Sequence, residues 1–296
     1  REQLQNAIAC NDEPIPVSLL KSFSLQDHAQ AVEFINTKSI TTLDNFEYNN
    51  NGDEITRRVL EAKPRNFPFF LHLEHFPTQF VELHALVNTR IIKDTSLLPY
   101  YHVLDEMFSM PMVEDGQFIP YEDVILKLQR ETVDAEVSLG LQGTAPDFID
   151  FKIRCKAENY SKAVEWIKHC LFDMVFEESR VRVLLDNYLT SIVEVKREGD
   201  LMLESLTGTH LYTERSVKRS VDPLFVEEIL GEVLDDIENG HYETKILPKL
   251  ELVRNELRAA FSKYHLLVLA DATKIGPDIY SPVSYTHLRA HETCAD

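Results

Sequence analysis

A strict alternation of apolar and charged residues between Ile149 and Cys155 constrains the fold most. The two sets interleave without a break: Ile149, Phe151, Ile153 and Cys155 alternate with Asp150, Lys152 and Arg154. Successive side chains of a strand point to opposite faces, so a period of two predicts a strand with one buried face and one exposed face. Such a strand needs a second layer over its apolar face.

Helices predicted from the spacing of apolar residues form that second layer. Apolar residues three and four positions apart predict helices over 97–108, 121–139, 163–174, 180–198, 201–207, 222–240 and 250–260. Asp222 followed by Pro223 is typical of a helix start, and Gly240 is typical of a helix end. We expect the apolar face of the strand around Phe151 to contact helices that carry Leu128 and Trp166.

Three more strands complete the pattern. Residues 69–75 and 80–90 are predicted to form adjacent strands with a hairpin around Pro77, and Tyr264–Leu269 a final strand. Helices that are segregated from a largely antiparallel sheet indicate an α/β (α+β) two-layer sandwich with helices on one face. We expect this domain to cover residues 66–278.

Both ends of the chain differ from this domain. Residues 1–65 are interpreted as a connector, with a strand edge around Phe23, a helix over Asp27–Asn36, a turn at 49–52 and a helical stretch over 55–62. Residues 279–296 are interpreted as disordered, because PVSYTHLRAHET can be encoded by a transposon end that runs into a sequencing adapter. His287 and His291 are therefore given no role.

Composition excludes several classes of protein. The 296 residues carry 49 acidic and 30 basic side chains, a formal net charge of −19, which disfavours nucleic-acid binding. No apolar run approaches the roughly 20 residues of a membrane span. The four cysteines are scattered, which favours a reducing compartment and excludes a thiolate zinc site. No targeting segment is visible.

Motifs for nucleotide binding and for serine catalysis are missing from the sequence. The nine glycines form neither G-x-G-x-x-G nor G-x-x-x-x-G-K, and G-x-S-x-G is absent. Cys155 and Cys170 lie on apolar faces of predicted elements, where a small buried side chain is expected rather than a nucleophile.

Histidines and a glutamate between positions 72 and 102 suggest a zinc site at first sight. They are His72, Glu74, His75, His84 and His102. On a strand the first two share a face while His75 points the other way, so these three cannot converge on one ion without a bulge. We expect them to be surface and edge-strand residues.

Two long stretches resemble the pitrilysin/insulinase family of zinc metalloproteases, near the presequence proteases. They read LLPYYHVLDEMFSMPMVEDGQFIPYEDVILKLQRETVDAEVSLGL and DFIDFKIRCKAENYSKAVEWIKHCLFDMVFEESRV. The resemblance is to the start of the second, non-catalytic half of such a protein. It implies four homologous α/β domains that close on an unfolded peptide, with zinc bound by H-x-x-E-H in the first domain.

The equivalent of that zinc motif is degenerate in this sequence. His102 stands at the first ligand position, Asp105 replaces the general base and Glu106 replaces the second histidine. On a helix His102 and Glu106 would still share a face. An aspartate is one methylene shorter than glutamate and would place its carboxylate poorly as a base. No catalytic residue and no metal ligand is therefore assigned.

The resemblance implies a non-catalytic domain of a zinc metalloendopeptidase, inactive as this fragment. Zinc would belong to the intact parent, and the partners would be the catalytic N-terminal half of the same chain and unfolded peptides. Basic peptides would suit the acidic runs 131–136 and 227–238, although such runs are commonly solvated helix faces. The alternative is a scaffold or binding subunit related to the non-catalytic subunits of mitochondrial processing peptidase and to respiratory-complex core proteins. The expected compartment is the cytoplasm, or alternatively the mitochondrial matrix.

Overall fold

A computed structural model describes most of the predicted domain. It covers residues 41–43, 54–65, 67, 69–141, 144–213, 215–275, 279–280 and 282. All of them belong to the compact unit 37–296. The expectations for Phe23, Asp27–Asn36 and the turn at 49–52 lie outside these residues.

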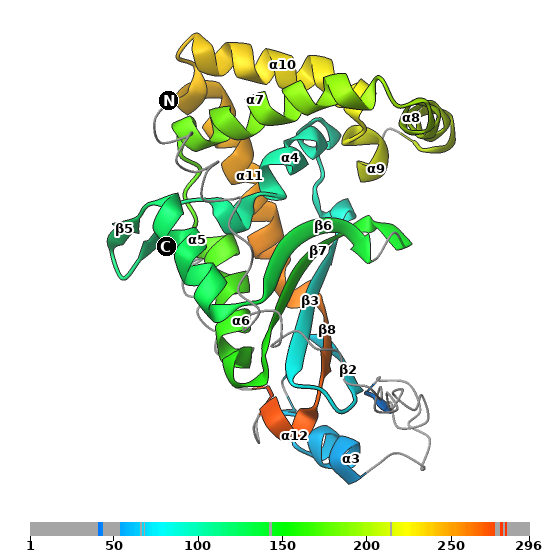
Figure 1. Ribbon diagram of the computed structural model, residues 1–296, viewed down its shortest axis with the longest axis vertical. Coiled ribbons are helices and arrows are strands. Elements are labelled where there is room, and N and C mark those ends of the chain that lie inside the picture. The colour runs from blue at the N-terminus through cyan, green and yellow to red at the C-terminus, as the bar shows by residue number, and fades with distance from the viewer. Residues whose placement is uncertain are drawn as a thin grey trace, which may run out of the picture. The chain divides into compact units, whose positions relative to one another are not determined.

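The main sheet has six strands in the order β1-β2-β8-β3-β7-β6 (Figure 1). Their bounds are β1 Thr41–Leu43, β2 Phe70–His75, β3 Phe80–Asn88, β6 Asp134–Leu141, β7 Thr144–Lys156 and β8 His265–Ala270. Only β2 and β8 run parallel, and all other neighbours are antiparallel. The predicted α+β class with a largely antiparallel sheet is confirmed.

The predicted hairpin around Pro77 is wrong, because β8 lies between β2 and β3. β8 pairs with β2 from Phe70↔His265 onward and with β3 from Val81↔Ala270 onward. Its apolar sequence LLVLA explains this position, since a central strand has both backbone edges hydrogen-bonded and both neighbours to pack against. Sequence proximity therefore did not decide the pairing.

The predicted helix over 121–139 is also wrong in its second half. Helix α5 covers Tyr121–Glu131 and ends at Thr132, whose φ of −124° and ψ of 164° are extended. β6 follows and pairs with β7, with Val137 opposite Phe151. Ala135 and Leu139 fit the helical stripe, but together with Val137 they also fit a period of two, and pairing with a long neighbouring strand decided the outcome.

The short helices α9 Val217–Ser220 and α12 Ala272–Ile275 were not predicted, and the other remaining helices follow the predicted order. These others are α3 Glu54–Glu61, α4 Tyr101–Leu104, α6 Tyr160–Lys168, α7 Glu178–Val195, α8 Gly199–Leu211, α10 Pro223–Glu238 and α11 Leu247–Ala259. A small hairpin, β4 Met112–Glu114 and β5 Gln117–Ile119, turns at Asp115 and Gly116. Asp222 caps α10 as predicted, because its side chain accepts the Leu224 N–H. No helix among the described residues is long and apolar enough to cross a membrane.

One face of the sheet is buried and the other is left partly open. On the buried face Ile149, Phe151 and Ile153 are at most 1% exposed. Trp166 of α6 is 1% exposed, and Leu128 of α5 packs against the same core, as predicted. Alternate residues of β2 and β8 follow the same rule, with one residue buried and the next half-exposed.

The packed domain extends two residues beyond its predicted end at 278. Ile279 and Tyr280 are each 2% exposed. The Tyr280 ring packs edge-on against Phe67 at 5.0 Å between centroids, and its hydroxyl donates to the Val59 carbonyl. The expectation of disorder is therefore wrong for these two residues, and except for Pro282 the rest of the tail lies outside the described residues.

Replacing Phe151 with alanine should destabilise the domain by about 3–5 kcal/mol. The side chain is fully buried and its ring lies 6.3 Å from that of Tyr264, so its removal leaves a cavity in the core. Urea unfolding measures the loss. Phe118→Ala is the matched control, because Phe118 is 56% exposed and should cost less than about 0.5 kcal/mol. Equal losses in the two variants would contradict the assignment of the core.

Candidate functional site

His102 is held inside the protein by its surroundings. It lies on the single turn of α4 and is 9% exposed. Its ring stacks on Tyr188 of α7 with 3.9 Å between centroids, and its Nε2–H donates to the Val221 carbonyl at 3.1 Å. Burial lowers the pKa of His102 to about 4, so the ring is neutral at physiological pH. Nε2 is thus not available to a metal, whereas the other ring nitrogen, Nδ1, is buried without a hydrogen-bond partner.

Asp105 points toward His102 without bonding to it. The nearest approach, Asp105 Oδ2 to His102 Nδ1, is 3.9 Å, and Asp105 Oδ1 is buried without a hydrogen-bond partner. Burial, together with the nearby charge of Glu106, raises the pKa of Asp105 to about 7. At neutral pH the Asp105 carboxyl is therefore protonated in part of the molecules, and it faces a neutral imidazole.

Glu106 does not share a helix face with His102, contrary to the expectation from the spacing. α4 ends at Leu104, and Glu106 precedes a separate 3-10 turn over Met107–Ser109. Its carboxylate accepts the Ser109 hydroxyl at 2.9 Å and is exposed. The predicted helix over 97–108 is divided into a 3-10 stretch over Thr95–Tyr100 that contains Pro99, the single turn of α4, and the 3-10 turn over Met107–Ser109.

The three motif residues do not fit a zinc ion. Zinc needs at least three converging ligand atoms, and here one histidine nitrogen is bonded to a carbonyl while the glutamate points elsewhere. No group of three or more His, Cys, Asp or Glu side chains in the described parts of the chain is arranged to hold a metal.

The other histidines of the sequence cluster are also separated. His72 Nε2 and Glu74 Oε1 lie 2.9 Å apart on the open face of β2, whereas the Nδ1 of the buried His75 accepts the Ala272 N–H at 3.1 Å. The predicted division of faces is thus confirmed. The expectation of surface and edge-strand residues is wrong for His75, His84 and His102, which are buried, because β2 and β3 lie inside the sheet and α4 lies in the helical layer. His84 lies on β3 and has partners of its own.

His84 forms the charged group that sequence reasoning missed. Its Nδ1 lies 2.6 Å from Asp150 Oδ2 and its Nε2 lies 3.0 Å from Glu82 Oε1. Burial opposes a charge on the ring, but the hydrogen bonds and charges of the two carboxylates outweigh burial, and the pKa of His84 is raised. Only an imidazolium donates both bonds. Pairing of β3 with β7 brings Asp150 close, and this pairing is not visible in either strand alone.

The two cysteines on the core faces are inert. Cys155 and Cys170 are fully buried, and burial raises the pKa of Cys155 to about 11 and that of Cys170 well above its usual range. The thiolate is the reactive form, so neither residue is suited to nucleophilic catalysis.

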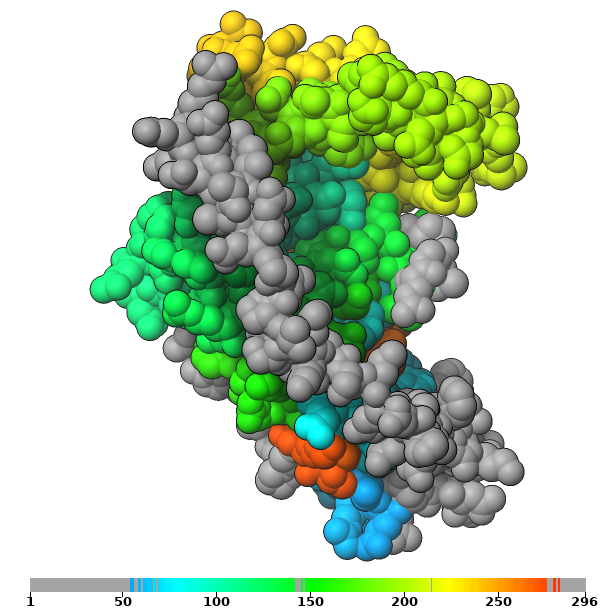
Figure 2. All heavy atoms as spheres, viewed as in Figure 1, coloured from blue at the N-terminus to red at the C-terminus, as the bar shows by residue number. Residues whose placement is uncertain are grey.

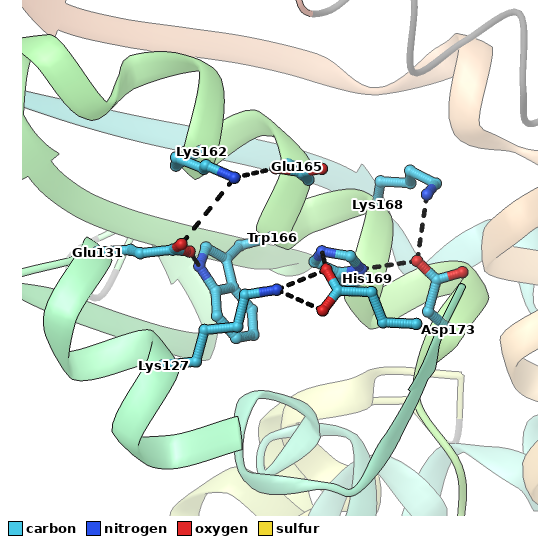
Figure 3. Close-up of polar contacts among 9 residues, drawn as sticks. Lys127, Glu131, Lys162, Glu165, Trp166, Lys168, His169 and Asp173 are labelled. Carbon is cyan, nitrogen blue, oxygen red and sulfur yellow. Dashed lines mark hydrogen bonds and ion pairs between the residues drawn. The ribbon is translucent and has the colours of Figure 1, made fainter. Parts of the chain in front are cut away.

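The acidic runs are largely engaged within the protein. Glu131 accepts the Trp166 indole N–H at 2.8 Å and faces Lys162 at 4.0 Å, between α5 and α6 (Figure 3). In the same region Lys127 Nζ lies 5.7 Å from the centre of the Trp166 ring. In the second run Glu227 pairs with Lys196 on α7. These contacts favour a structural role for the runs over selection of basic peptides.

Removing His84 should destabilise the protein most at low pH. A raised pKa means that the stabilisation is fully present below the usual value of 6.5 and is lost as the pH rises through the higher folded value. The difference in unfolding free energy between wild type and His84→Asn should therefore shrink from pH 6 to pH 9. His72→Asn, on the open face, serves as the control. A difference that grows with pH would contradict the assignment.

Asp105→Asn should stabilise the protein at high pH. The pKa of Asp105 is raised, so its ionisation opposes folding from the unfolded value of 3.8 upward and does so fully above about 7. The shift corresponds to about 4 kcal/mol, but the side chain is 33% exposed and solvent screening reduces the gain to about 1–2 kcal/mol at pH 8. Asp186→Asn, at an exposed position, should show no such gain. A loss of stability at pH 8 in Asp105→Asn would sink this interpretation.

Similarity searches place the chain among longer proteins. No family model matches it. It is 55% identical to uncharacterized protein YOL098C of Saccharomyces cerevisiae over 95% of this chain and 28% of that protein. It is 27% identical to an uncharacterized protein of Schizosaccharomyces pombe, over 86% of this chain and 25% of that protein. A conserved protein of Enterococcus faecalis of known structure gives a TM-score of 0.47, with 14% identity over 68% of this chain and 46% of that chain. The chain thus spans about a quarter of the length of these two fungal relatives.

Proposed function

We propose that this chain is a non-catalytic domain of a longer zinc-dependent endopeptidase that encloses and degrades unfolded peptides. One observation carries the proposal: the position that resembles a zinc motif is packed as structure. His102 is buried against Tyr188 and bonded to Val221, while Glu106 points to solvent. The domain alone has no peptidase activity, and zinc belongs to another part of the longer polypeptide.

The open face of the sheet supports the role of a chamber wall. Side chains of β2, β8 and β3 leave a shallow depression of about 490 Å³ there, lined mainly by apolar residues. His72 and Glu74 are the polar part of this lining, together with His265. A surface with apolar and hydrogen-bonding groups and little net charge suits unfolded peptides of mixed composition. The compartment we propose is the cytosol, with the mitochondrial matrix as the alternative.

A scaffold or binding subunit is the second candidate. The same packing around His102 supports it, because neither function requires a metal in this domain. The two differ in the remainder of the polypeptide. An intact H-x-x-E-H motif there favours the endopeptidase, and its absence favours the scaffold.

The isolated chain should neither retain zinc nor cleave peptides. The reason is the missing ligand set at His102, Asp105 and Glu106. Metal analysis after mild chelation, together with cleavage assays on unstructured peptides, measures both properties. His102→Gln is the matched variant, because its side-chain amide can still donate to the Val221 carbonyl. Stoichiometric zinc that is lost in His102→Gln would overturn the proposal.

A further inference from the structure

Helix α8 buries a serine and exposes leucines. Of its 13 residues only Ser205 is buried, and the Ser205 hydroxyl donates to the Asp222 carboxylate. Leu203, Leu206 and Leu211 are 66%, 53% and 73% exposed. A surface helix of a globular domain normally shows the opposite pattern, with leucines inward and polar groups outward. The large apolar side chains of α8 therefore lack a covering layer among the described residues.

A groove adjoins the exposed leucines. Its volume is about 730 Å³, and its apolar lining comes from Leu201, Leu203 and Leu211 of α8 together with Val195, Val221 and Pro223. Figure 1 shows α8 end-on, next to α9, and Figure 2 shows the same region in yellow-green at the upper right. Contiguous apolar surface of this kind marks an interaction site.

Four of the five charged side chains that line the groove are engaged, the exception being the exposed Asp200. Lys218 Nζ lies 3.2 Å from Glu204 Oε1, and Arg219 donates to the Tyr212 carbonyl at 3.3 Å. Asp222 accepts hydrogen bonds from Ser205 and from the Leu224 N–H. The groove therefore offers little unpaired charge to a ligand, and its complement is an apolar protein surface rather than a basic peptide.

A lipid surface does not fit α8. Helices that lie on membranes carry lysine and arginine on their polar face. The polar side chains of α8 include Asp200, Glu204 and His210, with no lysine or arginine. The acidic chain as a whole, with a net charge of −19, would also be repelled by anionic lipids.

The length of the two fungal relatives indicates what could cover the exposed leucines of α8. The match covers 28% of the budding yeast relative and 25% of the fission yeast relative, so more than two thirds of each lies outside it. We propose that the exposed leucines of α8 and the adjoining groove dock an apolar surface from the part of the longer polypeptide that lies outside residues 1–296. This inference rests on the proposed longer polypeptide and is independent of its peptidase activity.

Hydrogen exchange of the α8 amides tests the docking. In the full-length polypeptide they should exchange at least about tenfold more slowly than in the chain 1–296. Leu203→Glu with Leu211→Glu should abolish that protection, yet leave the thermal unfolding of the chain 1–296 unchanged. Leu126→Glu with Leu252→Glu is the matched control, since these leucines are 49% and 47% exposed on other helices, and it should keep the protection.

Two results would overturn the proposal. These are equal exchange of α8 in both chains, and loss of stability of the chain 1–296 in the α8 double variant. Self-association of the chain 1–296 that the α8 double variant abolishes would assign the groove to a second copy instead. None of these readouts involves zinc or peptide cleavage, so they fail or succeed separately from the proposed function.

Discussion

The insertion of β8 between β2 and β3 is the constraint on which the rest of the structure depends. β8 comes from the end of the described domain and pairs parallel with β2 and antiparallel with β3. The chain therefore passes through the helices from α6 to α11 before it returns to the middle of the sheet as β8. One face becomes the core around Phe151, and the other keeps His72, Glu74 and His84 at the surface or in pairs with carboxylates.

This arrangement explains why histidines that lie close together in the sequence do not form a metal site. His102 belongs to the helical layer, His75 to the buried face and His72 to the open face. Each has a hydrogen-bond partner on one ring nitrogen. The other nitrogen of His102, Nδ1, has only Asp105 near it, at 3.9 Å, and two groups are fewer than the three ligands that a zinc site needs. Glu131 of the first acidic run is likewise engaged within the protein, because its carboxylate accepts the hydrogen bond of the Trp166 indole N–H.

The sequence predicted what local periodicity controls. The strand around Phe151, its buried face, the cap of α10 at Asp222 and the division of His72 from His75 are all found in the structure. Its failures are non-local. The stretch around Val137 fits both a helix and a strand, and pairing with β7 decided between them. The hairpin at Pro77 failed because the central strand comes from about 190 residues further along the chain.

The candidate site was predicted only in part, for the same reason. The degenerate spacing of His102, Asp105 and Glu106 was visible, but the break of the helix after Leu104 was not. The bond between His84 and Asp150 required the register of two strands, and the exposed leucines of α8 required knowledge of which face is covered. Contacts between distant segments determine the last two features.

The central claim is that zinc, if the longer polypeptide uses it, is bound away from this domain. The most direct measurement is the zinc content of the full-length polypeptide with and without His102→Gln. The account predicts stoichiometric zinc in both, because His102 is bonded to Val221 and stacked on Tyr188 rather than aimed at a ligand site. Loss of zinc in the His102→Gln polypeptide would contradict it.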